Sequence, residues 1–396
     1  MKYIFEFGAL LFSLSSFGQW NEVHVDVSDE WYKVETFENE VIYLLAMNKV
    51  AKSTDGGANW IYYSPSHAGY FTGMTFINAQ TGWLSSSFGE IVFTNDSGAN
   101  WTIIQTVAAY WKDIFFINNT HGWASSNAGE IFKTIDGGSN WTKEFQKIGE
   151  IAENVFFTDE LNGWFCTYEG SSFRTTDGGY SWTEIINQSV YRVYFSNQLN
   201  GWGVDYFGNV LKTSDGGIYW DIMSTNFSWQ LSHAKYISAY EGWAVGGSDC
   251  SGGICIPYHK ILYTKDGGQT WSSQDVSTAT SNMRINDIDF INTGNNNYSV
   301  YVCGGKGKLW VNHHQLSSIE KSLVNSRLSI KHEFDNIRLE SEETIDRIDI
   351  MNLEGKIIQS FTEVRNNSIS TQQLGQGGYI LAIYLQDGID YYKFIK

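Results

Sequence analysis

The strongest constraint on the fold of this 396-residue chain is an octet that occurs six times. The copies read STDGGANW (53–60), TNDSGANW (94–101), TIDGGSNW (134–141), TTDGGYSW (175–182), TSDGGIYW (213–220) and TKDGGQTW (264–271). Their aspartates, which lie 38 to 51 residues apart, are Asp55, Asp96, Asp136, Asp177, Asp215 and Asp266. A repeat of about 40 residues with short strands is typical of propellers and solenoids, so it outweighs any single motif.

Each repeat also carries the pattern of four short β-strands, which we name a to d. In residues 112–145 these are DIFFIN, GWASS, IFKT and WTKEF, with turn residues between them. β-branched and aromatic runs separated by Gly, Asn and Asp turns are typical of strands and hairpins. A glycine–tryptophan pair marks strand b in five repeats, at residues 82–83, 122–123, 163–164, 201–202 and 242–243.

The octet falls between strands c and d, where the chain must reverse direction. Its aspartate can accept backbone N–H groups two or three residues further on, and its glycines supply positive φ angles. An EF-hand loop would need several more oxygen ligands at fixed positions. A P-loop would need a lysine after its second glycine. We therefore interpret the octet as a structural corner of the fold.

The number of blades exceeds the number of octets. Residues 286–312 have the pattern of strands a, b and c without an octet, and QWNEVHV (19–25) has the pattern of an isolated strand d. Pairing of the two chain segments would complete a seventh blade and remove the open sheet edges. The sequence therefore predicts an all-β fold with a seven-bladed β-propeller over residues 19–315.

These octets resemble the Asp-box (BNR) repeat of sialidases and related propellers. Together with the Gly–Trp pairs, they resemble still more closely the family of the plant and cyanobacterial photosystem II assembly factor, over roughly residues 20–315. That resemblance implies a propeller that holds a partner protein. Sialidase chemistry is disfavoured, because a sialidase pocket uses three arginines and only Arg192 and Arg284 are expected near the channel mouth.

The two ends of the chain indicate export. Residues 1–18 have an apolar centre and end in small residues, which is typical of a secretory signal peptide. After a linker at 316–325, residues 326–396 alternate apolar and polar positions around glycine turns, which predicts a small β-sandwich. The segments NLEGKII, LGQGGYILAIY and YKFIK resemble the type A C-terminal sorting domain of the type IX secretion system. The resemblance implies a secreted or outer-membrane-surface protein that the secretion machinery recognises through residues 326–396.

The charge of the chain disfavours some classes of partner, and its cysteines indicate their own bonding state. With 26 Lys and Arg against 43 Asp and Glu, the net charge is −17, which argues against nucleic acid and anionic membranes. No interior apolar run is long enough for a transmembrane helix. In an oxidising compartment Cys250 and Cys255 are expected to form a disulfide, whereas Cys166 and Cys303 are expected to be buried free thiols. No histidine or cysteine cluster has zinc-ligand spacing, so neither a metal nor a cofactor is expected.

Strand direction predicts where a binding site would lie. Strand a is expected to line the channel, so that octets and a–b turns share one face, and b–c turns and d–a connections share the other. Loops from every blade meet on the second face, around the channel mouth. Aromatic and cationic residues of the d–a connections are therefore the candidate ligand-binding residues: Trp31, Tyr70, Tyr110, Trp111, Lys112, Tyr191, Arg192, Trp229, His233 and Arg284.

The predicted function is non-catalytic binding of an extracellular protein or polysaccharide at the channel mouth. Aromatic faces suit sugars or protein side chains, and Arg and Lys suit carboxylates. The alternative is a secreted glycoside hydrolase, which needs two carboxylates facing each other across a cleft. Its candidate acids lie near the same mouth: Asp113, Glu153, Asp205, Asp249 and Asp287.

Overall fold

A computed structural model of the chain contains β-strands and turns in two compact units, residues 1–315 and 316–396. The described residues of the first unit are 20–25, 29–66, 69–106, 109–185, 188–227, 230–238, 240–249, 256–274, 276, 284–294 and 297–315. Those of the second unit are 316, 328–333, 336–341, 345–352, 357–362, 368–371, 374, 378–385 and 388–395. The expected signal peptide and the expected Cys250–Cys255 disulfide lie outside these residues.

The first unit consists of seven four-stranded antiparallel sheets, which confirms the predicted propeller. Blade 1 contains β2 (Lys33–Phe37), β3 (Val41–Ala46), β4 (Lys49–Ser53) and β5 (Ile61–Tyr63). Blade 2 contains β6 (Phe71–Phe76), β7 (Gly82–Ser86), β8 (Glu90–Thr94) and β9 (Thr102–Thr106). Blade 3 contains β10 (Trp111–Phe116), β11 (Gly122–Ser126), β12 (Glu130–Thr134) and β13 (Thr142–Gln146).

The remaining blades repeat this pattern. Blade 4 contains β14 (Ala152–Phe157), β15 (Gly163–Thr167), β16 (Ser172–Thr175) and β17 (Thr183–Ile185). Blade 5 contains β18 (Arg192–Phe195), β19 (Gly201–Val204), β20 (Val210–Thr213) and β21 (Asp221–Met223). Blade 6 contains β22 (Leu231–Tyr236), β23 (Gly242–Asp249), β24 (Ile256–Thr264) and β25 (Ser272–Gln274). Blade 7 contains β26 (Ile285–Gly294), β27 (Asn297–Gly304) and β28 (Leu309–Gln315), completed by β1 (Asn21–Val23).

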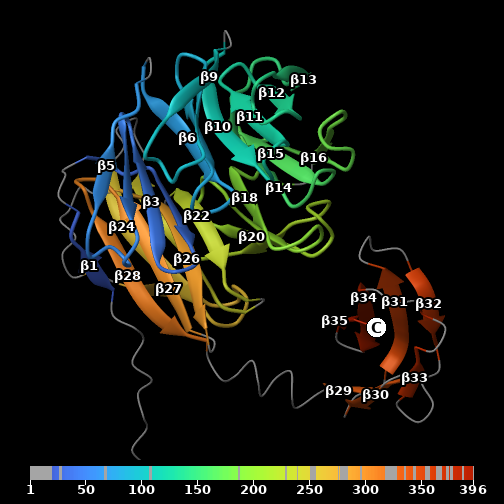
Figure 1. The fold of residues 1–396 in the computed structure, drawn as a ribbon. Helices are drawn as coiled ribbons and strands as arrows, with labels where there is room; N and C mark the ends of the chain where they lie inside the picture. Colours follow the sequence, from blue (N-terminus) through green and yellow to red (C-terminus); the bar gives the residue numbers. More distant parts are fainter. Residues whose placement is uncertain are drawn as a thin grey trace, which may run out of the picture. The chain divides into compact units, whose positions relative to one another are not determined.

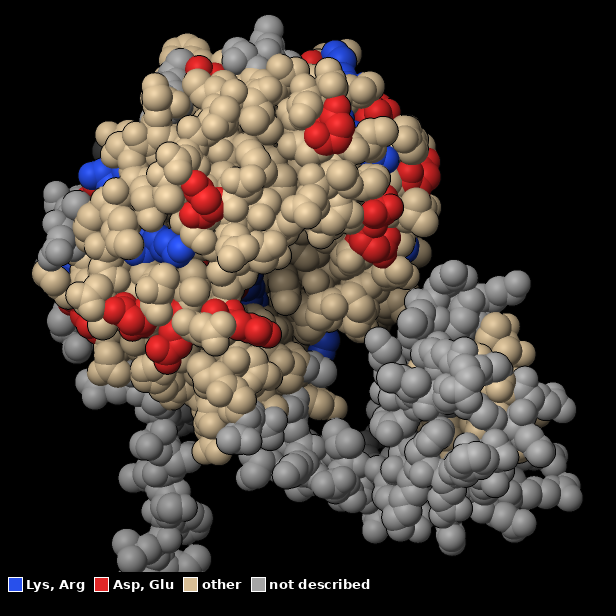
Figure 2. All heavy atoms as spheres, viewed as in Figure 1, with Lys and Arg blue, Asp and Glu red and all other residues tan. Residues whose placement is uncertain are grey.

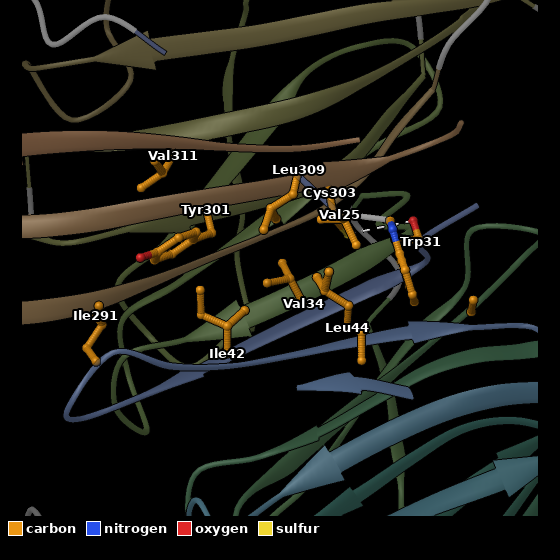
Figure 3. Close-up of a cluster of buried hydrophobic side chains, with 12 residues drawn as sticks. Val25, Trp31, Val34, Ile42, Leu44, Ile291, Tyr301, Cys303, Leu309 and Val311 are labelled. Carbon is orange, nitrogen blue, oxygen red and sulfur yellow. Dashed lines mark hydrogen bonds between the residues drawn. The ribbon is translucent and has the colours of Figure 1, made fainter. Parts of the chain in front are cut away.

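The first strand of each blade lies at the centre of the ring, and each contacts the first strand of the next blade (Figure 1). The ring closes as the sequence predicts, because β1 pairs antiparallel with β28 through Asn21 opposite Val311 and Val23 opposite Leu309. Apolar side chains of blades 7 and 1 fill the seam between the two chain ends, among them Ile42, Leu44, Tyr301 and Leu309 (Figure 3). One outer strand from the N-terminal end thus joins the last blade to the ring.

The Gly–Trp pair of strand b has a packing role that connects neighbouring blades. Trp123 of blade 3 stacks on Phe157 of blade 4 with ring centroids 3.5 Å apart. Phe157 in turn lies across Gly163 of its own blade, where an added Cβ would come within 2.3 Å of the ring. The same arrangement joins Trp83 to Phe116, Trp164 to Phe195, and Trp202 to Tyr236. The glycine therefore makes room for the ring that the preceding blade's tryptophan covers.

The octets form identical hydrogen-bonded corners, although the aspartate does not bond as expected. In all six, the Asp Oδ1 accepts a bond from the backbone N–H four residues on, at 2.8–3.0 Å, rather than two or three. It also accepts the hydroxyl proton of the first octet residue, at 2.8–2.9 Å. Positive φ angles at the two residues after the aspartate, such as 75° at Gly137 and 94° at Gly138, carry the chain around the carboxylate.

Backbone hydrogen bonds agree with the expected division of the two faces. Each octet donates to the a–b turn of its own blade, as Gly137 N does to Thr120 O and Gly178 N to Leu161 O. The b–c turns bond instead to the d–a connections, as Asn127 N does to Tyr110 O. The octet face and the opposite face, which we call the mouth face, are therefore distinct.

The second unit contains two sheets, as a small β-sandwich requires. One contains β29 (Leu328–Glu333), β30 (Asn336–Ser341) and β33 (Ser368–Ser370); the other contains β32 (Ile357–Phe361), β31 (Ile345–Asn352), β34 (Gly378–Leu385) and β35 (Gly388–Ile395). Ile337 and Ile369 of the first sheet share one core with Ile348, Ile350 and Leu381 of the second.

The expected state of two cysteines is confirmed. Cys166 and Cys303 are buried free thiols. Each lies on strand b, directly opposite a channel-facing residue of strand a in the antiparallel register. In the part of the chain that the structure describes, there is no helix long and apolar enough to cross a membrane.

Candidate functional site

The seven first strands each contribute one equivalent residue to a ring inside the channel of the propeller. We call this set of residues the channel ring. Its members occupy the position that pairs with the same point of strand b in each blade: Lys33, Gly73, Asp113, Asn154, Arg192, His233 and Asp287. All but glycine carry a polar or charged side chain. The ring therefore places charges inside a channel that the apolar blade cores surround.

Several side chains of the ring form contacts across blade boundaries. Lys33 of blade 1 reaches Asp113 of blade 3 at 2.5 Å, past Gly73, which has no side chain to obstruct it. The other oxygen of Asp113 accepts a hydrogen bond from Asn154 Nδ2 at 3.1 Å. His233 Nδ1 lies 2.5 Å from Asp287 Oδ1, and Asp287 Oδ2 accepts the Val34 amide at 3.1 Å. The ring therefore joins blades that are not neighbours in the sequence.

Electrostatics within the ring favour an ionised Asp287. Burial acts to raise its pKa, but His233 and the Lys33 and Lys235 ammonium groups lower that pKa to about 2. The carboxylate is therefore a fixed negative charge between blades 6, 7 and 1 at all physiological pH values.

A second layer of channel residues lies two positions further along each first strand. Lys235 pairs with Asp289 at 2.7 Å, and Asp289 also accepts the Thr36 amide at 2.7 Å. Glu35 Oε2 accepts the Phe76 amide at 2.8 Å. Burial raises the pKa of Glu35 to about 8, against the opposing effect of Lys33. The Glu35 carboxyl is therefore largely protonated at neutral pH.

We expect Glu35→Gln to stabilise the protein at pH 7.5 but not at pH 4. The folded pKa of Glu35, about 8, exceeds its ordinary value of 4.5, so the folded state binds this proton more tightly. Its contribution is therefore complete below pH 4.5 and is lost as the pH rises toward 8. Glutamine keeps the acceptor for Phe76 and does not titrate. Urea unfolding across this pH range measures the difference, with the exposed Glu38→Gln as control. A gain in the free energy of unfolding that did not depend on pH would contradict the raised pKa of Glu35.

β-bulges shape the channel where it opens on the mouth face. The register between strands a and b shifts at this point in blades 2, 3, 4, 6 and 7. A bulge places an extra residue in one strand and redirects its side chain. Lys112, Glu153, Ser232 and Asn286 occupy bulges, directly before a channel-ring residue. Lys112 Nζ lies 2.9 Å from Glu153 Oε2. The sequence interpretation expected Lys112 and Glu153 at the mouth, but simple strand alternation does not reveal Ser232 and Asn286.

A pocket of about 270 Å³ lies at this mouth. Three of the expected ligand-binding residues line it, namely Tyr191, Arg192 and Arg284. Glu153, which was expected at the mouth as a candidate acid, also lines it. The other lining residues were not predicted: Tyr32, Gln230, Ser232, Gly247 and Asn286. Arg192 belongs both to this mouth pocket and to the channel ring beneath it. Figure 2 shows basic side chains within the central hollow and acidic side chains around it.

The remaining candidates lie elsewhere. Trp31 and Trp111 are fully buried: Trp31 is in the seam of blades 7 and 1 (Figure 3), and Trp111 packs on Phe132 and Trp141. These tryptophans therefore stabilise the blades and present no face to a ligand. Tyr70 and Tyr110 pair edge to face at 6.0 Å, outside the mouth pocket. Lys112 is paired with Glu153, His233 lies deeper in the channel ring, and Trp229 is outside the described residues.

The candidate acids of a glycoside hydrolase are engaged in structural contacts. Asp113 and Asp287 hold the channel ring, and Glu153 pairs with Lys112. Asp205 is buried in a hairpin turn, where it accepts the amides of Phe207 and Asn209. The side chain of Asp249 is outside the described residues.

Aromatic residues of the b–c turns form a part of the mouth face that the sequence interpretation missed. Tyr168 of blade 4 is 51% exposed, and Phe207 of blade 5 is 71% exposed. Phe88 occupies the corresponding turn of blade 2, also before a glycine. The sequence does contain a sign of this feature. In these b–c turns an aromatic residue stands before a glycine or an acidic residue, where a surface turn would ordinarily carry polar residues.

Comparison with known proteins decides the two-part organisation. Residues 325–396 match the family of the secretion system C-terminal sorting domain, where 326–396 was expected. The chain is a propeller followed by a sorting domain. This domain marks the protein as secreted or surface-located through the type IX system. No curated protein sequence matches the chain.

Solved structures show the fold of the first part. One described as YCF48 bound to D1 peptide has 19% identity and a TM-score of 0.61, covering 76% of this chain and 98% of that one. YCF48 from Cyanidioschyzon merolae has 15% identity and a TM-score of 0.60, covering 74% and 99%. The extracellular domain of the putative one component system BT4673 from B. thetaiotaomicron has 13% identity and a TM-score of 0.52, covering 95% and 58%. At these identities the likeness concerns the fold alone.

Proposed function

We propose that the propeller is a non-catalytic binding protein whose mouth pocket holds a carboxylate-bearing segment of another extracellular protein. The main support is the contrast between its lysines and arginines. Lys33, Lys112 and Lys235 each have a carboxylate partner within 3 Å. Arg192 and Arg284 both line the mouth pocket, and among the described residues no carboxylate lies within 4.0 Å of either guanidinium. Glu153, Asp113 and Asp287 act on Arg192 only from a greater distance. In a chain of net charge −17, two such guanidinium groups at one opening favour an anionic ligand.

Surface composition favours a protein ligand over a polysaccharide. Trp31 and Trp111, which would have been the best platforms for sugar rings, are buried. The exposed aromatic groups on this face include Tyr168, which contacts the pocket residue Tyr191, and Phe207. Exposed aromatic side chains beside a polar pocket are typical of protein interfaces. A propeller of the same fold has been solved bound to a peptide, YCF48 with D1 peptide, which makes peptide capture a reasonable use of this architecture.

The proposed function includes export. We infer that residues 1–18 direct the chain out of the cytoplasm and that the sorting domain carries it through the type IX machinery. The two signals act in sequence, since a signal peptide delivers a chain to the periplasm and the sorting domain is used after that step. Binding would then take place outside the cell.

Arg284→Ala is expected to lower the affinity for carboxylate-containing peptides at least tenfold. A hydrogen bond to a charged group contributes about 1.5–3 kcal/mol, and a factor of ten corresponds to about 1.4 kcal/mol. The probe is a library of random dodecapeptides selected on the full-length protein, followed by synthesis of the selected peptides. We expect these peptides to contain Asp or Glu, and their Asn or Gln counterparts to bind weakly.

The matched control is Lys143→Ala, which removes a cation from the outer strand of blade 3, away from the mouth. It should leave the dissociation constants unchanged. Selection of peptides without acidic residues, or undiminished binding to Arg284→Ala, would overturn the proposed function.

A further inference from the structure

Three tyrosines in mutual contact extend outward from the mouth pocket at the boundary of blades 4 and 5. Tyr191 is buried, Tyr206 is half-buried and Tyr168 is exposed. The ring centroids of Tyr191 and Tyr206 are 4.6 Å apart, those of Tyr168 and Tyr206 are 5.4 Å apart, and those of Tyr168 and Tyr191 are 6.4 Å apart. Phe207 follows Tyr206 in the chain. We call these four residues the aromatic wall. Tyr191 lines the mouth pocket itself, so the wall begins where the pocket ends.

A rigid turn presents the exposed end of this wall. Asp205 Oδ1 accepts the Phe207 amide at 2.9 Å and the Asn209 amide at 2.8 Å, and Asp205 Oδ2 accepts the Asn209 side-chain amide at 2.8 Å. These bonds fix the b–c turn of blade 5 and leave Phe207 71% exposed. Because the backbone of the turn is already ordered, less conformational entropy is lost when a partner covers Phe207, which favours binding.

The two carboxylates behind the wall already have partners. Glu153 pairs with Lys112, and Glu169 accepts the Ile151 amide at 2.9 Å. The buried Tyr206 hydroxyl has no hydrogen-bond partner among the described residues. Burial raises the pKa of Tyr206, as do Tyr191, Tyr168 and Glu153, so the group remains a neutral phenol. The wall therefore offers an apolar surface rather than a free negative charge.

We propose that the aromatic wall binds an apolar side chain adjacent to the carboxylate that the mouth pocket holds. This inference rests on the proposed function of the pocket. The Arg192 guanidinium carbon lies 5.8 Å from the centre of the Tyr191 ring, so the cation and the wall are contiguous. An extended peptide advances about 3.3 Å per residue, so a side chain one or two positions from the acidic residue reaches the wall. The preferred ligand is thus an extended segment that contains an acidic residue next to a large apolar one.

A four-peptide comparison on the full-length protein tests this specificity separately from the pocket. The labelled probes are octapeptides of glycine and serine that carry Phe–Asp, Gly–Asp, Phe–Asn or Lys–Asp at the centre, each made in both orders. Fluorescence anisotropy gives the dissociation constants. We expect the better Phe–Asp order to bind at least fivefold more tightly than Gly–Asp, and Phe–Asn to bind weakly.

Each outcome has a separate meaning. Equal binding of Phe–Asp and Gly–Asp, both stronger than Phe–Asn, would overturn the aromatic subsite and leave the carboxylate pocket intact. Preference for Lys–Asp would overturn the apolar assignment in favour of a cation over the tyrosines. Absence of any dependence on aspartate would overturn both the subsite and the proposed function.

Variants assign the effect to the wall. Phe207→Ala and Tyr168→Ala should remove the advantage of Phe–Asp over Gly–Asp while leaving Gly–Asp binding unchanged. Phe88→Ala is the matched control, since Phe88 is 67% exposed in the corresponding turn of blade 2 and does not contact the wall. If Phe88→Ala reduced the advantage as much as Phe207→Ala did, the subsite would be wrongly placed.

Discussion

Replacing Gly163 by alanine is expected to lower the free energy of unfolding of the propeller by about 2–3 kcal/mol. The new Cβ would come within 2.3 Å of the Phe157 ring, and Phe157 cannot move away because Trp123 stacks on its other side at 3.5 Å. Unlike a surface glycine, Gly163 is not at positive φ, so the effect comes from packing rather than from backbone strain. Urea unfolding followed by tryptophan fluorescence measures it.

Tryptophan fluorescence reports on the propeller alone, because no tryptophan occurs after Trp310. The control is Gly305→Ala, where an added Cβ would meet its nearest atom at 3.9 Å and φ is not positive. Its unfolding midpoint should stay close to that of the wild type. If both variants were equally stable, the explanation of the Gly–Trp pair as an inter-blade packing device would be wrong.

Asp287→Ala is expected to lower the free energy of unfolding still more, by about 3–5 kcal/mol near neutral pH. The substitution leaves His233 and the Val34 amide without the carboxylate that each now contacts, and it removes a negative charge beside Lys33 and Lys235. Removal of one partner from a buried charge network is costly because the others remain out of water. The same tryptophan-detected unfolding experiment measures the loss.

The pH dependence of this loss identifies its electrostatic origin. The folded pKa of Asp287 is about 2, below its ordinary value of 3.8. Its stabilising contribution is therefore present above about pH 4 and disappears as the pH falls toward 2. The difference between the wild type and Asp287→Ala should shrink over that range. Asp287→Asn keeps an acceptor for Val34 and should be intermediate at pH 7. A deficit unchanged at low pH would assign the effect to packing alone.

The sequence allowed the propeller to be predicted in detail because its determinants are local and repeated. Each octet contains the hydroxyl, the aspartate and two residues of positive φ, which are both glycines in five copies and Ser97 and Gly98 in the other, so six copies specify six similar turns. The closure through residues 19–25 could be inferred from counting strands. The local pattern did not predict the hydrogen bonds within the octet, where the aspartate carboxylate accepts the backbone N–H group four residues further on.

The candidate site was only partly predictable. Trp31 and Trp111 were expected at the mouth because they precede strand a, yet both turn into the seams between blades. β-bulges interrupt the alternation of strand a, so Ser232 and Asn286 reach the pocket although simple alternation does not place them there. The strand register decides whether a side chain faces the pocket. This register is not evident from the sequence of any single blade.

The amino-acid sequence by itself determined the blade architecture, the division of the two faces and the presence of a sorting domain, since each depends on short motifs read along the chain. Tertiary structure alone decided which charges meet. Lys33 pairs with Asp113, 80 residues away, and His233 with Asp287, because ring closure brings equivalent positions of different blades to one axis. The mouth pocket and the aromatic wall arise in the same way. Their side chains come from separate blades, and only the closed ring sets the distances between them.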